Sequence, residues 1–191
     1  MLVIETERLV LRELTEADFD AAREILGDAR VMYAWEHGFS DWETRAWIAE
    51  NIARYRRDGF SYLAAVERAG GALAGFIGPL VETVDGERRM GVGYILGKNF
   101  WGRGYATEGA AACVDYAFDQ LDADEVIAEI RPENSASRRV AERLGMTARE
   151  SFVKIYKGKE MPHLIYIVTK DERRARRQDR QPQTTDCARR D

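Results

Sequence analysis

The sequence predicts an α/β domain built on a mixed sheet, and three observations indicate it. Residues 60–67, 72–81 and 87–96 have the composition of strands and are joined by glycine-containing turns, as in a meander. Residues 41–57 and 110–121 instead repeat apolar side chains every three or four positions, which is typical of helices that bury one face. Both patterns occur in one chain of 191 residues, which is long enough for one domain with a full core.

One strand and one helix open the chain. Residues 8–12 are a short strand candidate. Thr15, followed by Glu16-Ala17-Asp18, predicts the cap of a helix that stops near Gly27.

A second helix is predicted from Asp41 to about Arg57. Ser40 and Glu43 form its capping box. Helical spacing places Trp47 on the surface side and directs five other side chains toward the core. These five are Trp42, Ala46, Ala49, Ile52 and Ala53.

The remaining elements follow the meander. A glycine loop leads into a helix with a buried stripe formed by Ala110, Cys113, Val114, Ala117 and Leu121. Residues 126–130 form a short buried strand, residues 134–144 a helix, and residues 147–156 and 164–169 two final strands. We therefore expect about seven strands and about four helices.

Composition excludes several classes of function. A formal net charge of -4 offers no global attraction for nucleic acid, so we expect no nucleic-acid partner. No apolar run approaches the length of a membrane span, and the first residues lack a signal-peptide pattern, so we expect no membrane partner and a cytoplasmic location. Only Cys113 and Cys187 occur, far apart, together with two histidines, which predicts neither a disulfide framework nor a metal site.

The end of the chain differs from the rest. From Asp171 the sequence has no aromatic residue and no repeating apolar position. We therefore expect a domain over residues 1–170 and a flexible polar tail over residues 171–191.

The stretch WGRGYATEG, residues 101–109, predicts an anion-binding loop. Gly102 and Gly104 can adopt positive φ and let N–H groups approach a ligand, while the helix that follows offers unpaired donors and a positive dipole end. A Walker loop would need Lys and then Ser or Thr after its last glycine and is excluded. A dinucleotide fingerprint matches poorly because Thr107 stands at its third glycine position. On spacing alone, a glycine turn capped by Thr107 stays open.

Gly104-Tyr105-Ala106 resembles the end of the acyl-CoA pyrophosphate loop of the GCN5-related N-acetyltransferases (GNAT). Residues 6–14, 94–109 and 131–146 resemble the branch of ribosomal-protein-alanine N-acetyltransferases, in the family's order and spanning nearly the whole chain. The resemblance implies one domain with a twisted, mostly antiparallel sheet. That sheet would splay open between its fourth and fifth strands, here residues 87–96 and 126–130, to admit the thioester arm of acetyl-CoA.

The resemblance also implies which residues hold acetyl-CoA, the expected co-substrate. The backbone of residues 94–96 would hold the pantetheine arm and supply an oxyanion donor, the loop would bind the pyrophosphate, and Asn134 would contact the arm. An ordinary central strand, a solvated Arg103 and a helix-capping Asn134 stay open as alternatives. The residues so assigned are Tyr94, Ile95, Leu96, Trp101, Gly102, Arg103, Gly104, Tyr105, Ala106, Thr107 and Asn134.

Acyl transfer to an amine requires a neutral nitrogen, an oxyanion donor and a proton for the departing thiolate. The tyrosine acid of many family members corresponds to Ala141, so the resemblance passes that role to Ser137. The carboxylate that the branch often carries three residues before the strand tyrosine is replaced by Gly91. His163 is the candidate base because its unperturbed pKa lies near neutrality, although a structural role stays open. The acidic alternatives are Glu87, Glu108, Glu129 and Glu160.

The linker VMYAWEHGFSDW between the first two predicted helices is strongly aromatic. In the resembled fold this linker shapes the acceptor pocket, with Tyr33, Trp35 and His37 as candidates, while packing between helices is the alternative. An α-amine, with a pKa of about 8, needs less help from a base than a lysine at about 10.4. The absence of an obvious base therefore favours α-amines or small amines.

The sequence thus predicts an acetyl-CoA-dependent N-acetyltransferase in which an amine attacks the thioester directly in a ternary complex. The expected acceptor is the N-terminal α-amine of a protein or peptide. A small free amine (polyamine, amino acid or aminoglycoside) is one alternative, and a non-catalytic acyl-CoA-binding sensor is another. Dimers are common in the resembled family, so a homodimer stays open.

Overall fold

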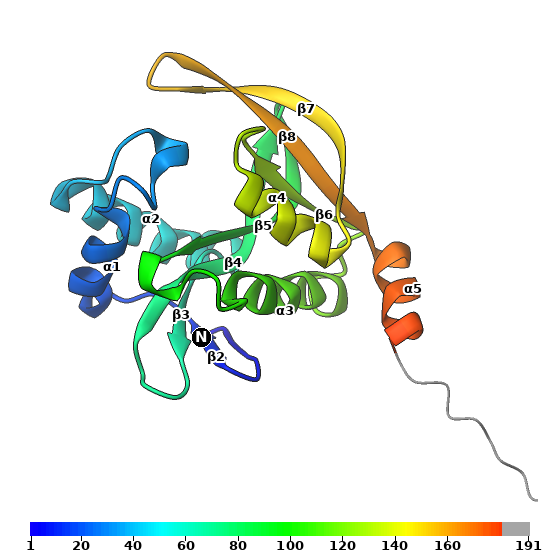
Figure 1. The fold of residues 1–191 in the computed structure, drawn as a ribbon, viewed down its shortest axis with the longest axis horizontal. Helices are drawn as coiled ribbons and strands as arrows, with labels where there is room; N and C mark the ends of the chain where they lie inside the picture. Colours follow the sequence, from blue (N-terminus) through cyan, green and yellow to red (C-terminus); the bar gives the residue numbers. More distant parts are fainter. Residues whose placement is uncertain (181–191) are drawn as a thin grey trace, which may run out of the picture.

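An eight-stranded sheet forms the centre of the protein in a computed structural model that describes residues 1–180 (Figure 1). The strand order is β1-β2-β3-β4-β5-β6-β8-β7, and every neighbouring pair is antiparallel except β5 and β6. The strands are β1 (Val3–Glu5), β2 (Leu9–Arg12), β3 (Leu63–Glu67), β4 (Leu73–Val84), β5 (Glu87–Leu96), β6 (Glu125–Ile130), β7 (Thr147–Tyr156) and β8 (Lys159–Thr169).

Helices cover both faces of the sheet (Figure 1). One core cluster joins α1 and α2 to residues such as Phe76 and Ile95, and another joins α3 and α4 to residues such as Val92 and Leu96. The helices are α1 (Phe19–Leu26), α2 (Asp41–Asp58), α3 (Tyr105–Asp119), α4 (Ser135–Leu144) and α5 (Lys170–Arg180), with short 3-10 turns at Glu16–Asp18, Tyr33–Trp35 and Lys98–Phe100.

The α/β class and the mixed, open sheet predicted from the sequence are confirmed. The additional strand is β1, only three residues long, which pairs with β2 from Val3↔Arg12 to Glu5↔Val10. β8 begins five residues earlier than predicted, because a two-residue turn at Lys157 and Gly158, both with positive φ, lets β7 and β8 pair from Tyr156↔Lys159.

The buried face of α2 differs from the prediction. Thr44, Ile48 and Asn51 are buried, and Trp47 packs its ring 4.8 Å from that of Phe76, whereas Trp42 is 76% exposed. Polar residues mark the true face, because Asn51 donates to the Trp47 carbonyl and accepts from the Ser61 hydroxyl. An apolar pattern could not reveal a buried face that contains Asn51, whose side chain is satisfied by such specific hydrogen bonds.

The helix predicted to bury Cys113 does so. Ala110, Cys113, Val114 and Ala117 on α3 are fully buried against the sheet. Burial raises the pKa of the Cys113 thiol, which keeps it protonated and unreactive.

The predicted polar tail begins instead with α5. Arg173 is 9% exposed, its Nε lies 2.7 Å from Asp115 Oδ1 of α3, and its guanidinium donates to the Leu144 carbonyl. Arg177 pairs with Asp115 and Asp119. Because these pairs hold α5 against α3, the domain extends past residue 170. The sequence did not predict this, since ion pairs leave no apolar pattern. The rest of the predicted tail, residues 181–191, lies outside the described residues.

The sheet opens between β5 and β6. This parallel pair has a single register partner, Gly91↔Ile127, whereas β4 and β5 pair over their whole length. Beyond Gly91, the backbone groups of β5 that point toward β6 have no ladder partner among residues 1–180. The predicted splay between these two strands is therefore present, and it exposes strand edges inside the protein.

No helix of the described residues is long and apolar enough to cross a membrane.

Candidate active site

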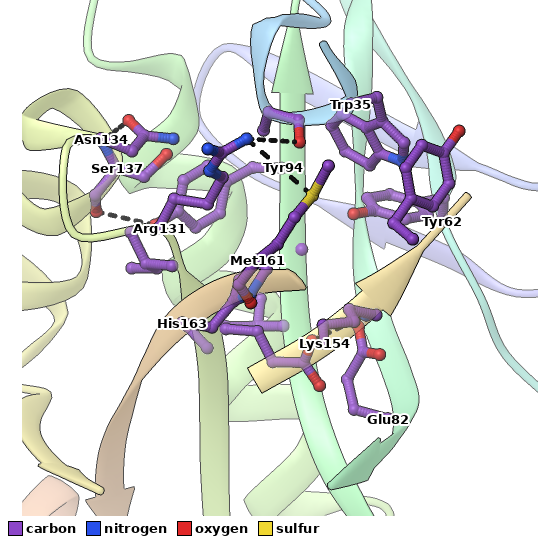
Figure 2. Close-up of a pocket in the computed structure, with 17 residues that line it drawn as sticks. Trp35, Tyr62, Glu82, Tyr94, Arg131, Asn134, Ser137, Lys154, Met161 and His163 are labelled. Carbon is purple, nitrogen blue, oxygen red and sulfur yellow. Dashed lines mark hydrogen bonds and ion pairs between the residues drawn. The ribbon is translucent and has the colours of Figure 1, made fainter. Parts of the chain in front are cut away.

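A cavity of about 170 Å³ occupies the opening between β5 and β6 (Figure 2). Side chains from the sheet, from α4, from the turn at Tyr33–Trp35 and from the β7–β8 hairpin line it. The lining residues used below are Trp35, Tyr62, Glu82, Tyr94, Glu129, Arg131, Asn134, Ser137, Lys154, Met161 and His163.

The cavity has two ends. Alternation along β5 places Val92 and Tyr94 on the face that carries α3 and α4, and Gly91 and Gly93 on the face that carries α1 and α2. Figure 2 accordingly shows Asn134 and Ser137 at one end and Glu82 and Lys154 at the other. Two reactants can therefore enter from opposite faces of the sheet and meet in the opening.

The α4 end is built around the start of that helix. Asn134 is the N-cap, and its side-chain oxygen accepts from the Ser137 N–H at 2.9 Å, so the capping role left open by the sequence is present. The Tyr94 hydroxyl donates to the Ser137 carbonyl at 2.9 Å, and burial raises the pKa of Tyr94. Asn134, Ser137 and Tyr94, all predicted site residues, thus lie together at the cavity.

The glycine loop ends in the N-terminus of α3. Gly102 and Gly104 have φ of 74° and 82°, the left-handed region that favours glycine. The first intrahelical bond of α3 is from Glu108 N to Gly104 O, and within residues 1–180 no acceptor takes the N–H groups of Tyr105, Ala106 or Thr107. Three converging donors at a positive helix end fit a pyrophosphate.

The loop is tied to the sheet by side chains. Trp101 Nε1 donates to the Leu96 carbonyl at 2.7 Å, which anchors the loop to the end of β5. Arg8 donates to the Arg103 carbonyl at 2.8 Å and binds Glu108 in the first turn of α3. The Arg103 side chain pairs with Glu67 at 3.3 Å, so its charge is at the loop but already partnered. The loop therefore keeps its shape without a ligand.

At the other end of the cavity, two glycines of β5 make room for side chains of neighbouring segments. A Cβ on Gly91 would lie 2.8 Å from Cγ of Glu82, and a Cβ on Gly93 would lie 2.3 Å from the Tyr62 hydroxyl. The sequence has Gly91 where the resembled branch often carries a carboxylate. In the structure, the Glu82 side chain of the neighbouring strand lies next to Gly91. Burial and the nearby Glu129 raise the pKa of Glu82 to about 7.

Glu129 is paired. Lys154 Nζ of β7 lies 2.8 Å from Glu129 Oε2, and the Glu129 side chain is 7% exposed. Its other oxygen, Oε1, is buried without a hydrogen-bond partner in the described part of the chain. The cavity floor therefore holds two carboxylates and one ammonium group.

His163 lines the same cavity from β8. Its Nδ1 lies 2.9 Å from the Met161 carbonyl, which can only accept, so the neutral ring carries its proton on Nδ1 and its lone pair on Nε2. Burial lowers the pKa of His163, and Lys154 and Arg131 act in the same direction. The imidazole is therefore neutral at pH 7.

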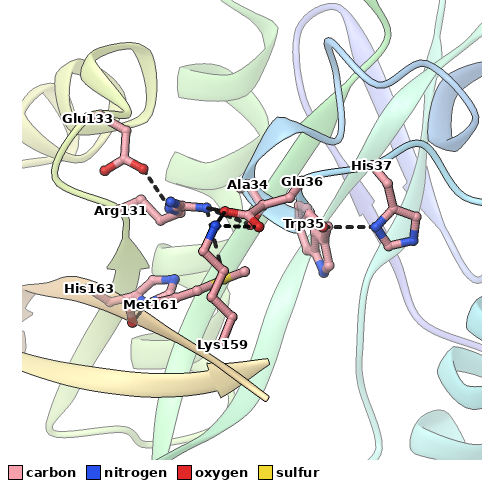
Figure 3. A network of polar contacts seen from close by, with 9 residues as sticks. All are labelled: Ala34, Trp35, Glu36, His37, Arg131, Glu133, Lys159, Met161 and His163. Carbon is pink, nitrogen blue, oxygen red and sulfur yellow. Dashed lines mark hydrogen bonds and ion pairs between the residues drawn. The ribbon is translucent and has the colours of Figure 1, made fainter. Parts of the chain in front are cut away.

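Of the three predicted acceptor-pocket residues, Trp35 lines the cavity, whereas Tyr33 and His37 lie outside its lining. Arg131 holds the Tyr33–Trp35 turn in place (Figure 3). Its guanidinium lies 3.4 Å from the Ala34 carbonyl and 3.4 Å from the Glu36 carboxylate. It also pairs with Glu133 at 2.6 Å. Lys159 of β8 binds Glu36 at 2.6 Å, and His37 pairs with Glu43 of α2 at 3.0 Å.

Sequence reasoning missed Glu82, Tyr62, Lys154 and Arg131. They lie on β4, just before β3, on β7 and just after β6, and only the pairing of the strands brings them together. The spacing of Gly91 and Gly93 was the one available signal, because two glycines on one face of a strand often mark a close approach by other groups. No group of three His, Cys, Asp or Glu residues within the described range could hold a metal ion.

Comparison with known proteins identifies relatives. Residues 8–147 match the sequence model of the family described as "Acetyltransferase (GNAT) domain". The uncharacterized N-acetyltransferase YnaD of Bacillus subtilis is 32% identical over 172 residues, 88% of this chain and 97% of the relative. An FsC-acetyl coenzyme A-N(2)-transacetylase of Aspergillus fumigatus is 40% identical over 88 residues, 44% of this chain and 37% of the relative.

Solved structures share the fold. A GNAT-family acetyltransferase from Bacillus anthracis superposes with a TM-score of 0.76 and 25% identity, covering 89% of this chain and 99% of that one. RimL, a ribosomal alpha-N-protein acetyltransferase solved in complex with coenzyme A, gives a TM-score of 0.71 and 20% identity over 90% of this chain and 99% of that one.

Proposed function

The chain belongs to the GNAT acetyltransferase family and is an acetyl-CoA-dependent acyltransferase, and from this premise we propose that its acceptor is the α-amine of a protein or peptide N-terminus. The observation that carries the proposal is the charge of the cavity at its α2 end, together with the small size of the whole opening. Both ends included, the cavity measures about 170 Å³, which is little room for an extended polyamine.

The charges of the cavity also disfavour a polycation. Glu129 is paired with Lys154, and Arg131 is paired with Glu36 and Glu133. Glu82 alone lacks an ion-pair or hydrogen-bond partner among residues 1–180. One free carboxylate matches one ammonium group, whereas an aminoglycoside or polyamine would need several.

Different elements around the cavity hold different parts of acetyl-CoA in our proposal. The open edge of β5 from Tyr94 to Leu96, together with Asn134, holds the pantetheine arm in our proposal, and the N–H groups of Tyr105, Ala106 and Thr107 hold the pyrophosphate. Acetyl-CoA supplies a thioester carbonyl that an amine can attack. Ser137 lies at the end of the cavity where the departing sulfur would be, and its hydroxyl can donate a hydrogen bond to that sulfur.

A small free amine is the second candidate, and one observation favours it. The fungal transacetylase named above, a coenzyme A-dependent N(2)-acetylating protein by its name, shares 40% identity over 88 residues, whereas RimL shares 20%. Both acceptors present a primary amine to the same pocket, so the chemistry is common to the two proposals.

An acceptor panel distinguishes them. Purified protein is incubated with acetyl-CoA and short peptides beginning with Ala, Ser or Gly, the same peptides with a blocked N-terminus, and free amino acids, spermidine and an aminoglycoside. Thiol release is measured, and mass spectrometry locates the acetyl group. We expect turnover with free N-termini only. Turnover confined to free amino acids or polyamines would replace the peptide acceptor by the small-amine one.

A further inference from the structure

The carboxylate of Glu82 has no role in the fold that the structure shows. It lies near the end of β4 and lines the cavity, and no hydrogen bond or ion pair involves it within residues 1–180. The residue is partly exposed rather than fully buried, so its carboxylate remains open to the cavity. Gly91 provides the space in which this side chain reaches the cavity. An unpaired acid directed into a reaction cavity indicates a ligand or a proton as its partner.

The groups that face Glu82 come from three elements and from the residue just before β3. Glu129 of β6 opposes its ionisation, whereas Lys154 of β7 and Arg54 of α2 favour it, and burial outweighs both cations. Tyr62, just before β3, is the fourth neighbour, and the negative charge of Glu82 raises its pKa further. With its pKa raised to about 7, Glu82 exchanges a proton readily near neutral pH.

We propose that Glu82 is the catalytic base of the reaction: its carboxylate binds the acceptor's ammonium group and takes one proton from it. This inference rests on the proposed function only in requiring a primary amine as acceptor. The neutral nitrogen attacks the thioester carbon, the new C–N bond forms, and the C–S bond breaks. The second proton of the nitrogen ends on the sulfur, and Glu82 releases its proton to water, so charge and atoms balance.

Glu82 suits this step better than His163. The neutral imidazole stands near Lys154 and Arg131, and both cations disfavour its protonation. An incoming ammonium group would be attracted more strongly by the unpaired carboxylate of Glu82 than by a neutral imidazole. Glu129 is held by Lys154, so Glu82 is the cavity carboxylate that is free to take the proton.

The test uses the acceptor with the highest turnover in the panel, whatever its class. We expect Glu82→Gln to lower kcat/KM by about a hundredfold or more. The affinity for acetyl-CoA and the melting temperature should stay unchanged. Asp85→Asn is the matched control, because it removes an exposed carboxylate from the turn of the same hairpin, outside the cavity lining. His163→Asn should cost less than Glu82→Gln.

A relocation variant separates chemistry from structure. Glu82→Ala should be as inactive as Glu82→Gln, and adding Gly91→Glu should restore a substantial part of the activity, because the new side chain enters the space that Glu82 leaves. Wild-type kcat/KM should rise with pH through about 7, and in Glu82→Gln this limb should move up to the pKa of the acceptor amine itself, about 8 for an α-amine. Unchanged turnover in Glu82→Gln, or an unchanged acidic limb, would overturn the proposal.

A direct titration needs no acceptor. Carbon-13 NMR of the glutamate carboxyls, with the Glu82 signal assigned by its loss in Glu82→Gln, should show a midpoint near 7. A midpoint in the ordinary glutamate range would refute the role of Glu82 even if the acceptor panel confirmed a peptide substrate. Conversely, failure of every peptide with turnover of a small amine would refute the proposed acceptor and leave the Glu82 test intact.

Discussion

The side chain of Glu82 lies against the α-carbon of Gly91: a Cβ added to that glycine would stand 2.8 Å from Cγ of Glu82. The two residues are on neighbouring strands, and Leu80 rather than Glu82 is the register partner of Gly91. Because Gly91 of β5 has no side chain, the Glu82 side chain of β4 can occupy that space, and its carboxylate reaches the cavity.

Replacing Gly91 by alanine should therefore reduce activity more than stability. Its φ lies outside the left-handed region, so alanine is allowed by the backbone, and the flexible Glu82 side chain would move to relieve the contact. We expect kcat/KM to fall by about tenfold or more, because small displacements of a base are costly to the reaction. Gly70→Ala, whose nearest neighbour would be a Glu67 oxygen at 3.6 Å, serves as the control. Equal kinetics in the two variants would contradict this account.

The loop before α3 offers a matched pair of glycines. Gly104 and Gly86 have φ of 82° and 86°, so alanine at either position should cost about 1 kcal/mol of stability. Only Gly104→Ala should also weaken acetyl-CoA binding, by about tenfold, because it distorts the donors at the start of α3. Calorimetric titration and urea unfolding measure the two effects. Equal acetyl-CoA affinities would show that the loop does not bind the pyrophosphate.

Glu108 should make stability depend on acidic pH. Against the opposing effect of burial, hydrogen bonds from Thr6 and Arg8 lower its pKa. A lowered folded-state pKa contributes stability that is present above the unfolded pKa and is lost as pH falls through the folded one. Glu108→Gln should therefore cost about 1 to 2 kcal/mol at pH 7, and much less below about pH 4. Urea unfolding at pH 7 and below about pH 4 measures this. A difference in unfolding free energy between wild type and variant that does not change with pH would contradict the prediction.

The ion pair between Lys159 and Glu36 should influence the acceptor and not acetyl-CoA. Lys159 is 2.6 Å from Glu36, next to the turn whose Trp35 lines the cavity. Such exposed pairs contribute little to stability and are weakened by salt. Lys159→Ala should raise the acceptor KM by about twofold to fivefold, and raised ionic strength should do the same to the wild type. Lys170→Ala, which breaks a pair with Asp122 on another part of the surface, should have no such effect.

Several elements could be predicted from the sequence because their signals are local. β5 and β7 have the predicted bounds, and Asn134 and Ser40 cap the helices that they were expected to open. Positive φ at Gly102 and Gly104 follows from local chemistry as well. In each case neighbouring residues in the sequence determine the conformation.

The remainder depends on contacts between distant residues. The buried face of α2 is defined by Asn51 and Ser61, a polar pair that no apolar pattern reveals. The absence of a carboxylate at Gly91 indicated a missing base, whereas the register of β4 against β5 places Glu82 there. That Glu82 lies next to Gly91 can be seen only once the pairing of β4 with β5 is known.

The most direct test of the two-sided cavity is a crystal structure with coenzyme A joined through an acetyl linker to the α-nitrogen of a short peptide. We predict that the pantetheine arm passes between β5 and β6 beside Tyr94 and Asn134, with the peptide nitrogen next to Glu82 on the α2 side. A pantetheine arm outside this opening, or a nitrogen on the α3 and α4 side away from Glu82, would contradict the account.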